Sequence, residues 1–245
     1  MDEKYFLNSG TNRGKIIVFE GIDCSGKETQ TKILFEKLRS ERVLCEMMSF
    51  PQYGTPMGDI VGECYLGKNL RHGDGSWFGD ADSVDPKIAS LLYAGDRRAA
   101  VPKINKILDS GTHLLLNRYY QSNMGHQGCK ISSVHEREQM FFWLQKLEIE
   151  MLEIPREDAT IFLYMPINVA IELMKIRDLK KEEVLDSHES NIEHLKRAEE
   201  TYLYLEKFFE WKRIDCALDG TIKSLRAADD ISDEIYKYVM EIISQ

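Results

Sequence analysis

The sequence predicts an α/β fold: a doubly wound, mainly parallel sheet of five strands flanked by helices. Three observations support this prediction. Short apolar runs alternate along the chain with segments of helical periodicity. The first apolar run ends in a glycine-containing turn that leads directly into a helical segment. A chain of 245 residues with 43% hydrophobic content can bury one substantial core. In such folds, functional groups gather beyond the carboxyl ends of the strands.

The expected elements follow in order along the chain. Apolar runs predict strands at 15–20, 43–50, 113–116, 160–165 and 211–216. Apolar positions spaced three or four residues apart predict helices that begin at Lys27 and that cover 85–108, 140–151, 168–176, 191–209 and 231–242. We expect a polar extension at 1–14 and a single domain at 15–245. The Gly- and Asp-rich stretch 71–83 is expected to be an irregular insertion.

Composition narrows the classes of function. A net charge of −9 and a pI near 5.3 argue against a broad surface for nucleic acid or an anionic membrane, whereas a small anionic ligand in a pocket remains compatible. The five cysteines are scattered and lack metal-ligand spacing, which favours reduced, buried thiols. No segment has the length and hydrophobicity of a membrane span or signal peptide. We therefore expect a cytoplasmic protein.

A phosphate-binding loop is predicted at Gly21-Ile-Asp-Cys-Ser-Gly26-Lys27. The string G-x-x-x-x-G-K lies between a predicted strand and a predicted helix, which is the context that its chemistry requires. Its backbone N–H groups can wrap phosphates, the helix N-terminus adds a favourable dipole, and Lys27 can follow charge on the β and γ oxygens. These features indicate a P-loop NTPase type of fold.

The residue after Lys27 departs from the usual pattern. A Ser or Thr hydroxyl normally ligates Mg²⁺ at this position, and here the residue is Glu28. Thr29 does not replace it simply, because the next helical residue points about 100° away.

Four segments, taken together, resemble the thymidylate kinase family. They are Phe19-Glu-Gly-Ile-Asp-Cys-Ser-Gly-Lys-Glu-Thr-Gln30, Phe50-Pro-Gln-Tyr53, Leu91-Leu-Tyr-Ala-Gly-Asp-Arg97, and Asn117-Arg-Tyr-Tyr-Gln-Ser122 continued to Gln127-Gly128. They occur in the same order as the family's motifs, and the similarity runs from about residue 15 to the C-terminus. The resemblance implies transfer of the ATP γ-phosphoryl group to dTMP to give dTDP, with Mg²⁺, in a homodimer. It also implies a short lid at about 175–190, where the match is weakest.

Roles for the site residues follow from the chemistry and the resemblance together. Arg97 and Arg118 can bind the acceptor phosphate and the migrating phosphoryl group, because guanidinium binds phosphate bidentately; each could instead be a structural ion-pair arginine. By resemblance, Tyr93 and Phe50 line the base pocket, Ser122 and Gln127 read the polar edge of the base, and Asp23 accepts from the sugar 3′-hydroxyl. The expected ATP-binding residues are Gly21, Cys24, Ser25, Gly26, Lys27, Glu28 and Thr29.

Two further cation and metal assignments are expected. Tyr53 stands where many relatives have a phosphate-binding arginine, and Cys24 and Ser25 leave the loop uncharged. A second catalytic cation must then come from elsewhere, and Arg177 is the first candidate, followed by Lys180 and Lys181. Glu28 is expected to hold Mg²⁺, directly or through water, while Asn117 replaces the family's carboxylate. A solvated Glu28 that favours only the helix dipole is the alternative.

Other functions remain open at this point. The acceptor could be dUMP, another pyrimidine monophosphate or a nucleoside. Glu28 and Asn117 could also mark a catalytically inactive nucleotide-binding sensor, which would bind ATP without turnover.

Overall fold

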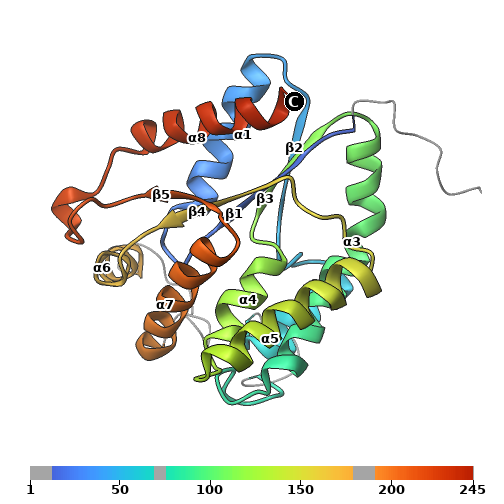
Figure 1. Cartoon of the computed structure of the whole chain (residues 1–245), viewed down its shortest axis with the longest axis vertical. Helices are drawn as coiled ribbons and strands as arrows, with labels where there is room; N and C mark the ends of the chain where they lie inside the picture. The colour runs from blue at the N-terminus through green and yellow to red at the C-terminus, as the bar shows by residue number, and fades with distance from the viewer. Residues whose placement is uncertain (1–12, 69–75, 179–190, 245) are drawn as a thin grey trace, which may run out of the picture.

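The sheet of this computed structural model is fully parallel. The structure describes residues 13–68, 76–178 and 191–244, and within them the strand order is β2-β3-β1-β4-β5 (Figure 1). The strands are β1 (Ile16–Glu20), β2 (Cys45–Ser49), β3 (His113–Asn117), β4 (Ala159–Tyr164) and β5 (Lys212–Asp215). All five expected strands are present. The central strand β1 is buried along its whole length, as its continuous apolar run predicts.

Helices cover both faces of the sheet. On one face α1 (Lys27–Ser40) packs against α8 (Ala228–Ile243), and on the other lie α3 (Pro86–Asp109), α4 (Tyr120–Gly128), α5 (Val134–Gln145) and α7 (Ile192–Phe208) (Figure 1). α6 (Ile167–Asp178) follows β4. The shorter segments are α2 (Pro56–Asp59), the π-helical turns η1 (Ile60–Tyr65) and η2 (Lys146–Met151), and a 3₁₀ turn η3 (Ile222–Ser224).

Local sequence explains where the principal helices begin. Asp85 caps α3 by accepting from the backbone N–H groups of Lys87 and Ile88 at 2.9 and 3.1 Å, and Pro86 occupies the first helical position, where no donor is needed. Asn191 caps α7 by accepting from His194 N–H at 3.0 Å. These caps fix the start of α3, which carries the pocket residues Tyr93 and Arg97, and of α7, which packs against α4.

Several elements were not predicted. α4 lies in a stretch that was interpreted only as a motif, and α2 and η1 fill a region with no expected structure. The helix expected at 140–151 is α5 followed by η2 and begins earlier, at Val134. Most of the expected lid, and residues 71–75 of the expected insertion, lie outside the described residues.

The topology places the site between β1 and β3. Phe19 pairs with Asn117 in the register of these neighbouring strands, so Glu20 and Asn117 end at one edge of the sheet. The glycine-rich loop leaves β1 at that edge and leads into α1, as the doubly wound arrangement requires.

No helix in the described part of the chain is long and apolar enough to cross a membrane.

Candidate active site

The loop after β1 adopts the conformation expected of a phosphate cradle. Gly21 and Gly26 have φ angles of 146° and 87°, and Gly26 caps α1. A Cβ atom on Gly21 would lie 2.6 Å from the Leu163 carbonyl oxygen, so this position excludes a side chain. Cys24, with φ of 58°, is the only residue in the loop other than glycine in the left-handed region. The loop therefore turns tightly between the end of β1 and the start of α1.

Lys27 is held against this loop. Its Nζ donates to the carbonyl oxygens of Gly21 and Ile22 at 2.9 and 2.7 Å, and the residue is 7% exposed. Burial, reinforced by the nearby charge of Arg118, lowers the pKa of Lys27 to about 7. An anionic ligand in the cradle would favour the charged form, which is the form that stabilises a transferring phosphoryl group.

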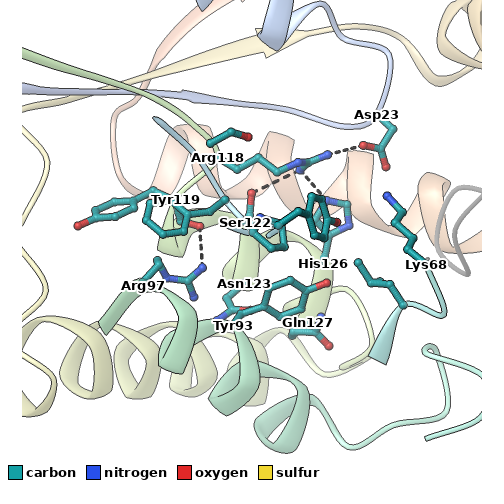
Figure 2. Close-up of a pocket in the computed structure, with 15 residues that line it drawn as sticks. Asp23, Lys68, Tyr93, Arg97, Arg118, Tyr119, Ser122, Asn123, His126 and Gln127 are labelled. Carbon is teal, nitrogen blue, oxygen red and sulfur yellow. Dashed lines mark hydrogen bonds and ion pairs between the residues drawn. The ribbon is translucent and has the colours of Figure 1, made fainter. Parts of the chain in front are cut away.

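Next to the cradle is a pocket whose wall is partly aromatic and partly polar (Figure 2). Phe50, Tyr93 and Tyr119 supply aromatic rings, and Phe50 and Tyr119 have ring centroids 5.8 Å apart. The principal polar residues of the lining are Asp23, Lys68, Arg97, Arg118, Ser122, Asn123, His126 and Gln127. An apolar cavity with a few convergent polar groups is typical of a small-molecule site.

Arg118 connects the cradle to this pocket. It follows β3 directly and has a φ of 68°, a strained conformation for a residue with a side chain. One terminal nitrogen, NH2, forms an ion pair with Asp23 of the cradle. The other, NH1, lies 3.4 Å from Ser122 Oγ and 3.2 Å from His126 Nε2 (Figure 2). Burial acts against the charge of both partners, yet their attraction raises the pKa of Arg118 and lowers that of Asp23.

Glu20 organises the residues around Arg118 and was not predicted as a site residue. This carboxylate is fully buried at the end of β1 and accepts from Tyr119 N–H at 2.9 Å, Ser122 Oγ–H at 2.8 Å and Tyr202 Oη–H at 2.9 Å. A charged residue at the end of an apolar strand, immediately before the cradle, was the signal that could have identified it. The turn that follows β3, together with α4 and α7, thus shares one buried acceptor.

Arg97 lies at the other end of the pocket from Asp23 (Figure 2). Its Nε and NH2 donate to the two carboxylate oxygens of Glu148, both at 2.5 Å, and its NH1 lies 3.5 Å from the Tyr119 carbonyl oxygen. The pair is 2% and 0% exposed, and Asn123 Nδ2 also donates to Glu148, at 3.0 Å. Of the alternatives open for Arg97, the buried ion pair is present, and two of its three nitrogens are engaged there.

Gln127 and Ser122, the expected base-reading residues, have different surroundings. Gln127 is fully buried against the pocket, and neither of its amide atoms has a hydrogen-bond partner among the described residues. Because such orphaned groups are costly, they indicate a ligand or water partner. Ser122 instead donates to Glu20 beside Arg118. Tyr93 lines the pocket edge-on to Tyr65, with centroids 5.6 Å apart.

Glu28 and Asn117 line a second, adjoining hollow. Its other lining residues include Thr31, Lys32 and Ser49. Glu28 is exposed, whereas Asn117 Oδ1 is buried and accepts no hydrogen bond from the described residues. Carboxylate, amide and hydroxyl oxygens are ligands that Mg²⁺ accepts, so these side chains fit the ion. Thr29 is exposed and does not line this hollow, whereas Thr31 donates to the Lys27 carbonyl oxygen at 2.8 Å.

The candidate lid cations are only partly described. Arg177 is half-buried near the end of α6, while Lys180 and Lys181 lie outside the described residues. Lys68, which no sequence pattern indicated, lines the pocket instead, with its ammonium 5.5 Å from the centroid of the Tyr53 ring.

A phosphate-binding loop beside a partly aromatic pocket, with an arginine between them, is the arrangement of the nucleotide kinase class. Comparison with known proteins identifies the family: the model for "Thymidylate kinase" matches residues 19–219, and the chain belongs to the thymidylate kinase family. The thymidylate kinase of Caldanaerobacter subterraneus subsp. tengcongensis is 31% identical over 93% of this chain and 97% of its own. That of Plasmodium falciparum is 25% identical over 96% and 94%.

A solved structure also matches the fold. The thymidylate kinase of Candida albicans superposes with a TM-score of 0.62 at 22% identity, covering 94% of this chain and 92% of its own. At this identity the likeness shows the fold, and the parallel α/β architecture predicted from the sequence is confirmed.

Proposed function

We propose that the protein transfers the γ-phosphoryl group of ATP to dTMP, giving dTDP and ADP. The observation that carries this proposal is the position of Arg118, which contacts Asp23 of the cradle on one side and Ser122 and His126 of the pocket wall on the other. A guanidinium between donor and acceptor phosphates can hold two polyanions together for in-line transfer. Family membership and the named relatives support dTMP as the acceptor.

At the donor end, the cradle would hold the ATP phosphates. It is formed by Gly21, Cys24, Ser25, Gly26 and Lys27, and Glu28 and Thr29 lie beside it at the start of α1. Lys27 is the cation nearest the loop carbonyls and would follow the charge that develops on the transferred group. Arg177 remains the proposed second cation at this end.

Mg²⁺ would be held at the hollow lined by Glu28 and Asn117. Glu28 supplies a carboxylate there, and the buried Oδ1 of Asn117 supplies a further oxygen that lacks a partner among the described residues. When bound, the ion would neutralise charge on the β and γ phosphate oxygens. With an amide rather than a carboxylate at position 117, Glu28 has no second negative charge next to it.

At the acceptor end, Arg118 and Lys68 would bind the dTMP phosphate. Lys68 lines the same pocket beside Tyr53, and its charge contributes to the lowered pKa of Asp23, which indicates proximity to the cradle. Lys68 therefore offers the cation that Tyr53 does not provide. Asp23 would accept from the sugar hydroxyl once the phosphate draws Arg118 toward itself.

The base would lie at the aromatic end of the pocket. We propose that Tyr93 and Phe50 contact its ring and that Gln127 pairs with its polar edge, because both amide atoms of Gln127 lack partners among the described residues. Arg97 would contribute only NH1 at this end, because Glu148 holds its other nitrogens. Ser122, bound to Glu20, would act beside Arg118 rather than on the base.

A homodimer is proposed from the exposed apolar side chains of two neighbouring helical segments. Ile88 and Leu91 on α3 are 49% and 51% exposed, and Phe142 on α5 is 55% exposed. Helix packing between two copies would cover such residues. A cytoplasmic location is proposed from the reduced, scattered cysteines.

Phosphorus NMR of a mixture of protein, ATP, Mg²⁺ and dTMP tests the reaction. We expect dTDP and ADP to appear in equal amounts, and the Lys27→Ala variant to lose at least about 100-fold in rate because a preorganised cation acts mainly in the transition state. ATP binding without dTDP formation by the wild type would instead support an inactive sensor.

A further inference from the structure

A row of hydrogen bonds runs from Arg118 into the body of the protein. Arg118 NH1 lies 3.2 Å from His126 Nε2, and His126 Nδ1 lies 3.2 Å from His194 Nε2. His194 Nδ1 lies 2.7 Å from Asp82 Oδ1. His126 is on α4, His194 is on α7 and Asp82 precedes α3, so three segments far apart in the sequence meet along this row.

The row has a fixed direction because arginine can only donate. Arg118 N–H must donate to His126 Nε2, which therefore carries no proton. The His126 proton is then on Nδ1 and is donated to His194 Nε2, and the His194 proton is on Nδ1 and is donated to Asp82. One obligate donor at the site thus sets the tautomers of both imidazoles, and both rings are neutral.

The packing around the two rings favours this arrangement. The His126 and His194 rings are nearly parallel, with centroids 5.5 Å apart and an interplanar angle of 11°, and the His194 side chain is 0% exposed. Burial lowers the pKa of His194, although Asp82 acts in the opposite direction. Cys129 also contacts His194, with its Sγ 3.7 Å from Nδ1, and burial raises the pKa of that thiol to about 12, so no thiolate competes for the proton.

Asp82 is itself anchored at the end of the row. Arg197 NH2 donates to Asp82 Oδ2 at 2.5 Å, and Asn191 Nδ2 donates to the same oxygen at 3.2 Å. Burial acts to raise the pKa of Asp82, but the bonds to His194 and Arg197 outweigh it and lower that pKa. The carboxylate is therefore a stable acceptor for His194.

We infer that His126 is a positioning residue for Arg118, and that His194 and Asp82 hold His126 in the tautomer that this role requires. The inference rests on the proposed role of Arg118 as the phosphate-binding arginine. By fixing NH1, the row directs NH2 of Arg118 toward Asp23 and the cradle. The backbone of Arg118, with its positive φ, does not fix the end of so long a side chain, so contacts at the guanidinium must do so.

Lowering the pH should remove the support that His126 gives to Arg118. Protonating Nε2 of His126 removes the acceptor and places a second cation against the guanidinium. Within the described part of the chain, the charged and titratable groups near His126 are Arg118, Asp23, Lys68 and Tyr202, and Glu20 lies next to them as the acceptor of Tyr202. Those near His194 are Asp82, Arg197, Lys130 and Cys129.

The tautomers can be measured directly in the wild-type protein. Long-range ¹H–¹⁵N correlation spectra at about pH 8 distinguish Nδ1–H from Nε2–H imidazoles and from imidazolium. The chain has six histidines, so the spectra of His126→Gln and His194→Gln assign the two signals by their loss. We expect Nδ1–H at both residues. An Nε2–H tautomer or an imidazolium at His126 would overturn the inference.

Kinetics test the positioning role. His126→Phe should lower kcat/KM for dTMP by about 10- to 100-fold, the loss expected for a hydrogen bond to a charged group, with the KM for ATP nearly unchanged. His126→Gln should restore most of the activity, because its amide can accept from Arg118 and donate to His194. His135→Gln, an exposed histidine on α5 that pairs with Gln139, is the matched control.

A pH profile separates positioning from a structural role. The ratio of wild-type to His126→Gln activity should fall between about pH 8 and about pH 5.5, because only histidine titrates there, while substrate ionisation cancels in the ratio. A ratio that stays constant, or a His126→Phe variant with unchanged kcat/KM for dTMP, would overturn the inference. Failure of the proposed function would appear separately, as a wild-type protein without dTMP turnover, and the NMR spectra do not depend on it.

Discussion

Asp23 of the phosphate cradle and Arg118 at the end of β3 form an ion pair in which each side chain is 18% exposed. The pair joins the glycine-rich loop after β1 to the pocket lined by Arg118. Because the two residues leave neighbouring strands at the same edge of the sheet, the fold itself brings them together.

Replacing Arg118 with Lys should therefore impair use of the acceptor more than binding of the donor. A lysine keeps the charge but loses the fork that binds phosphate bidentately, so we expect kcat/KM for dTMP to fall about 10- to 100-fold. The KM for ATP should change little. Arg98→Lys, at an exposed arginine on α3 that bonds the Leu152 carbonyl oxygen, is the matched control. An equal rise in the KM for ATP would place Arg118 on the donor side.

Glu148 should matter for stability. It is fully buried and accepts two hydrogen bonds from Arg97, so Glu148→Gln leaves a buried guanidinium without its counter-charge. We expect the free energy of unfolding in urea to fall by about 3 to 5 kcal/mol. Glu193→Gln removes an exposed acid that pairs with Lys196 and should leave the free energy of unfolding nearly unchanged. Equal effects of the two changes would show that the buried pair contributes little.

Much of this architecture follows from local sequence. The buried strands are apolar runs, and the cradle combines a strand, glycines and a helix start, so each could be predicted from a short window. α4 could not, because its apolar periodicity is weak: Gly125 and Gly128 face Tyr202 and Phe141 so closely that a Cβ atom would lie 2.5 and 2.7 Å from those rings. Packing against other helices, rather than propensity, stabilises it.

The site was predictable in its residue types more than in its contacts. Arg97 and Glu148 are 51 positions apart, and Glu148 lies in a π-helical turn, whereas the apolar periodicity indicated only a helix over 140–151. His126 lies beside the expected Gln127, but its link to His194 depends on how α4 and α7 pack. Long-range pairing of polar groups therefore had to come from the structure.

Cysteine chemistry should distinguish the cradle from the core. Burial raises the pKa of Cys129 and Cys216 to about 12, so at about pH 8 almost none of either thiol is the reactive thiolate. Among the five cysteines only Cys24, in the cradle, is not buried. With iodoacetamide we expect mass spectrometry to find Cys24 alkylated and the other two intact, with ATP and Mg²⁺ slowing the reaction at Cys24.

Two controls accompany that experiment. In urea all five cysteines should react, which shows that burial is the cause of protection. Alkylation of Cys129 in the folded protein as fast as that of Cys24 would contradict the buried environment, and a rate at Cys24 unaffected by ATP would contradict its place in the cradle.

The effect of replacing Glu28 on the Mg²⁺ dependence of turnover should depend on which residue is present at position 117. If Glu28 holds Mg²⁺ and Asn117 avoids a second carboxylate, then Glu28→Thr and Asn117→Asp should each raise the Mg²⁺ concentration needed for half-maximal turnover. The double variant should recover much of the loss, because it restores a hydroxyl and a carboxylate. Glu36→Thr, at an exposed acid on the same helix, should have no effect.

Additive losses in the double variant would contradict this exchange of ligands. A Glu28→Ala variant with unchanged Mg²⁺ dependence would do so as well, and would leave Glu28 as a solvated acid at the start of α1.

The choice of acceptor is the most direct test of the account. We would measure kcat/KM by ADP release for dTMP, dUMP, dCMP, UMP and thymidine, in the wild type and in Gln127→Ala. Since a buried amide is left unpaired by the wrong base, the account predicts the highest value for dTMP, and a ratio of dTMP to dCMP that falls about 10-fold or more in the variant. A higher value for another acceptor, or an equal loss with all acceptors in the variant, would contradict it.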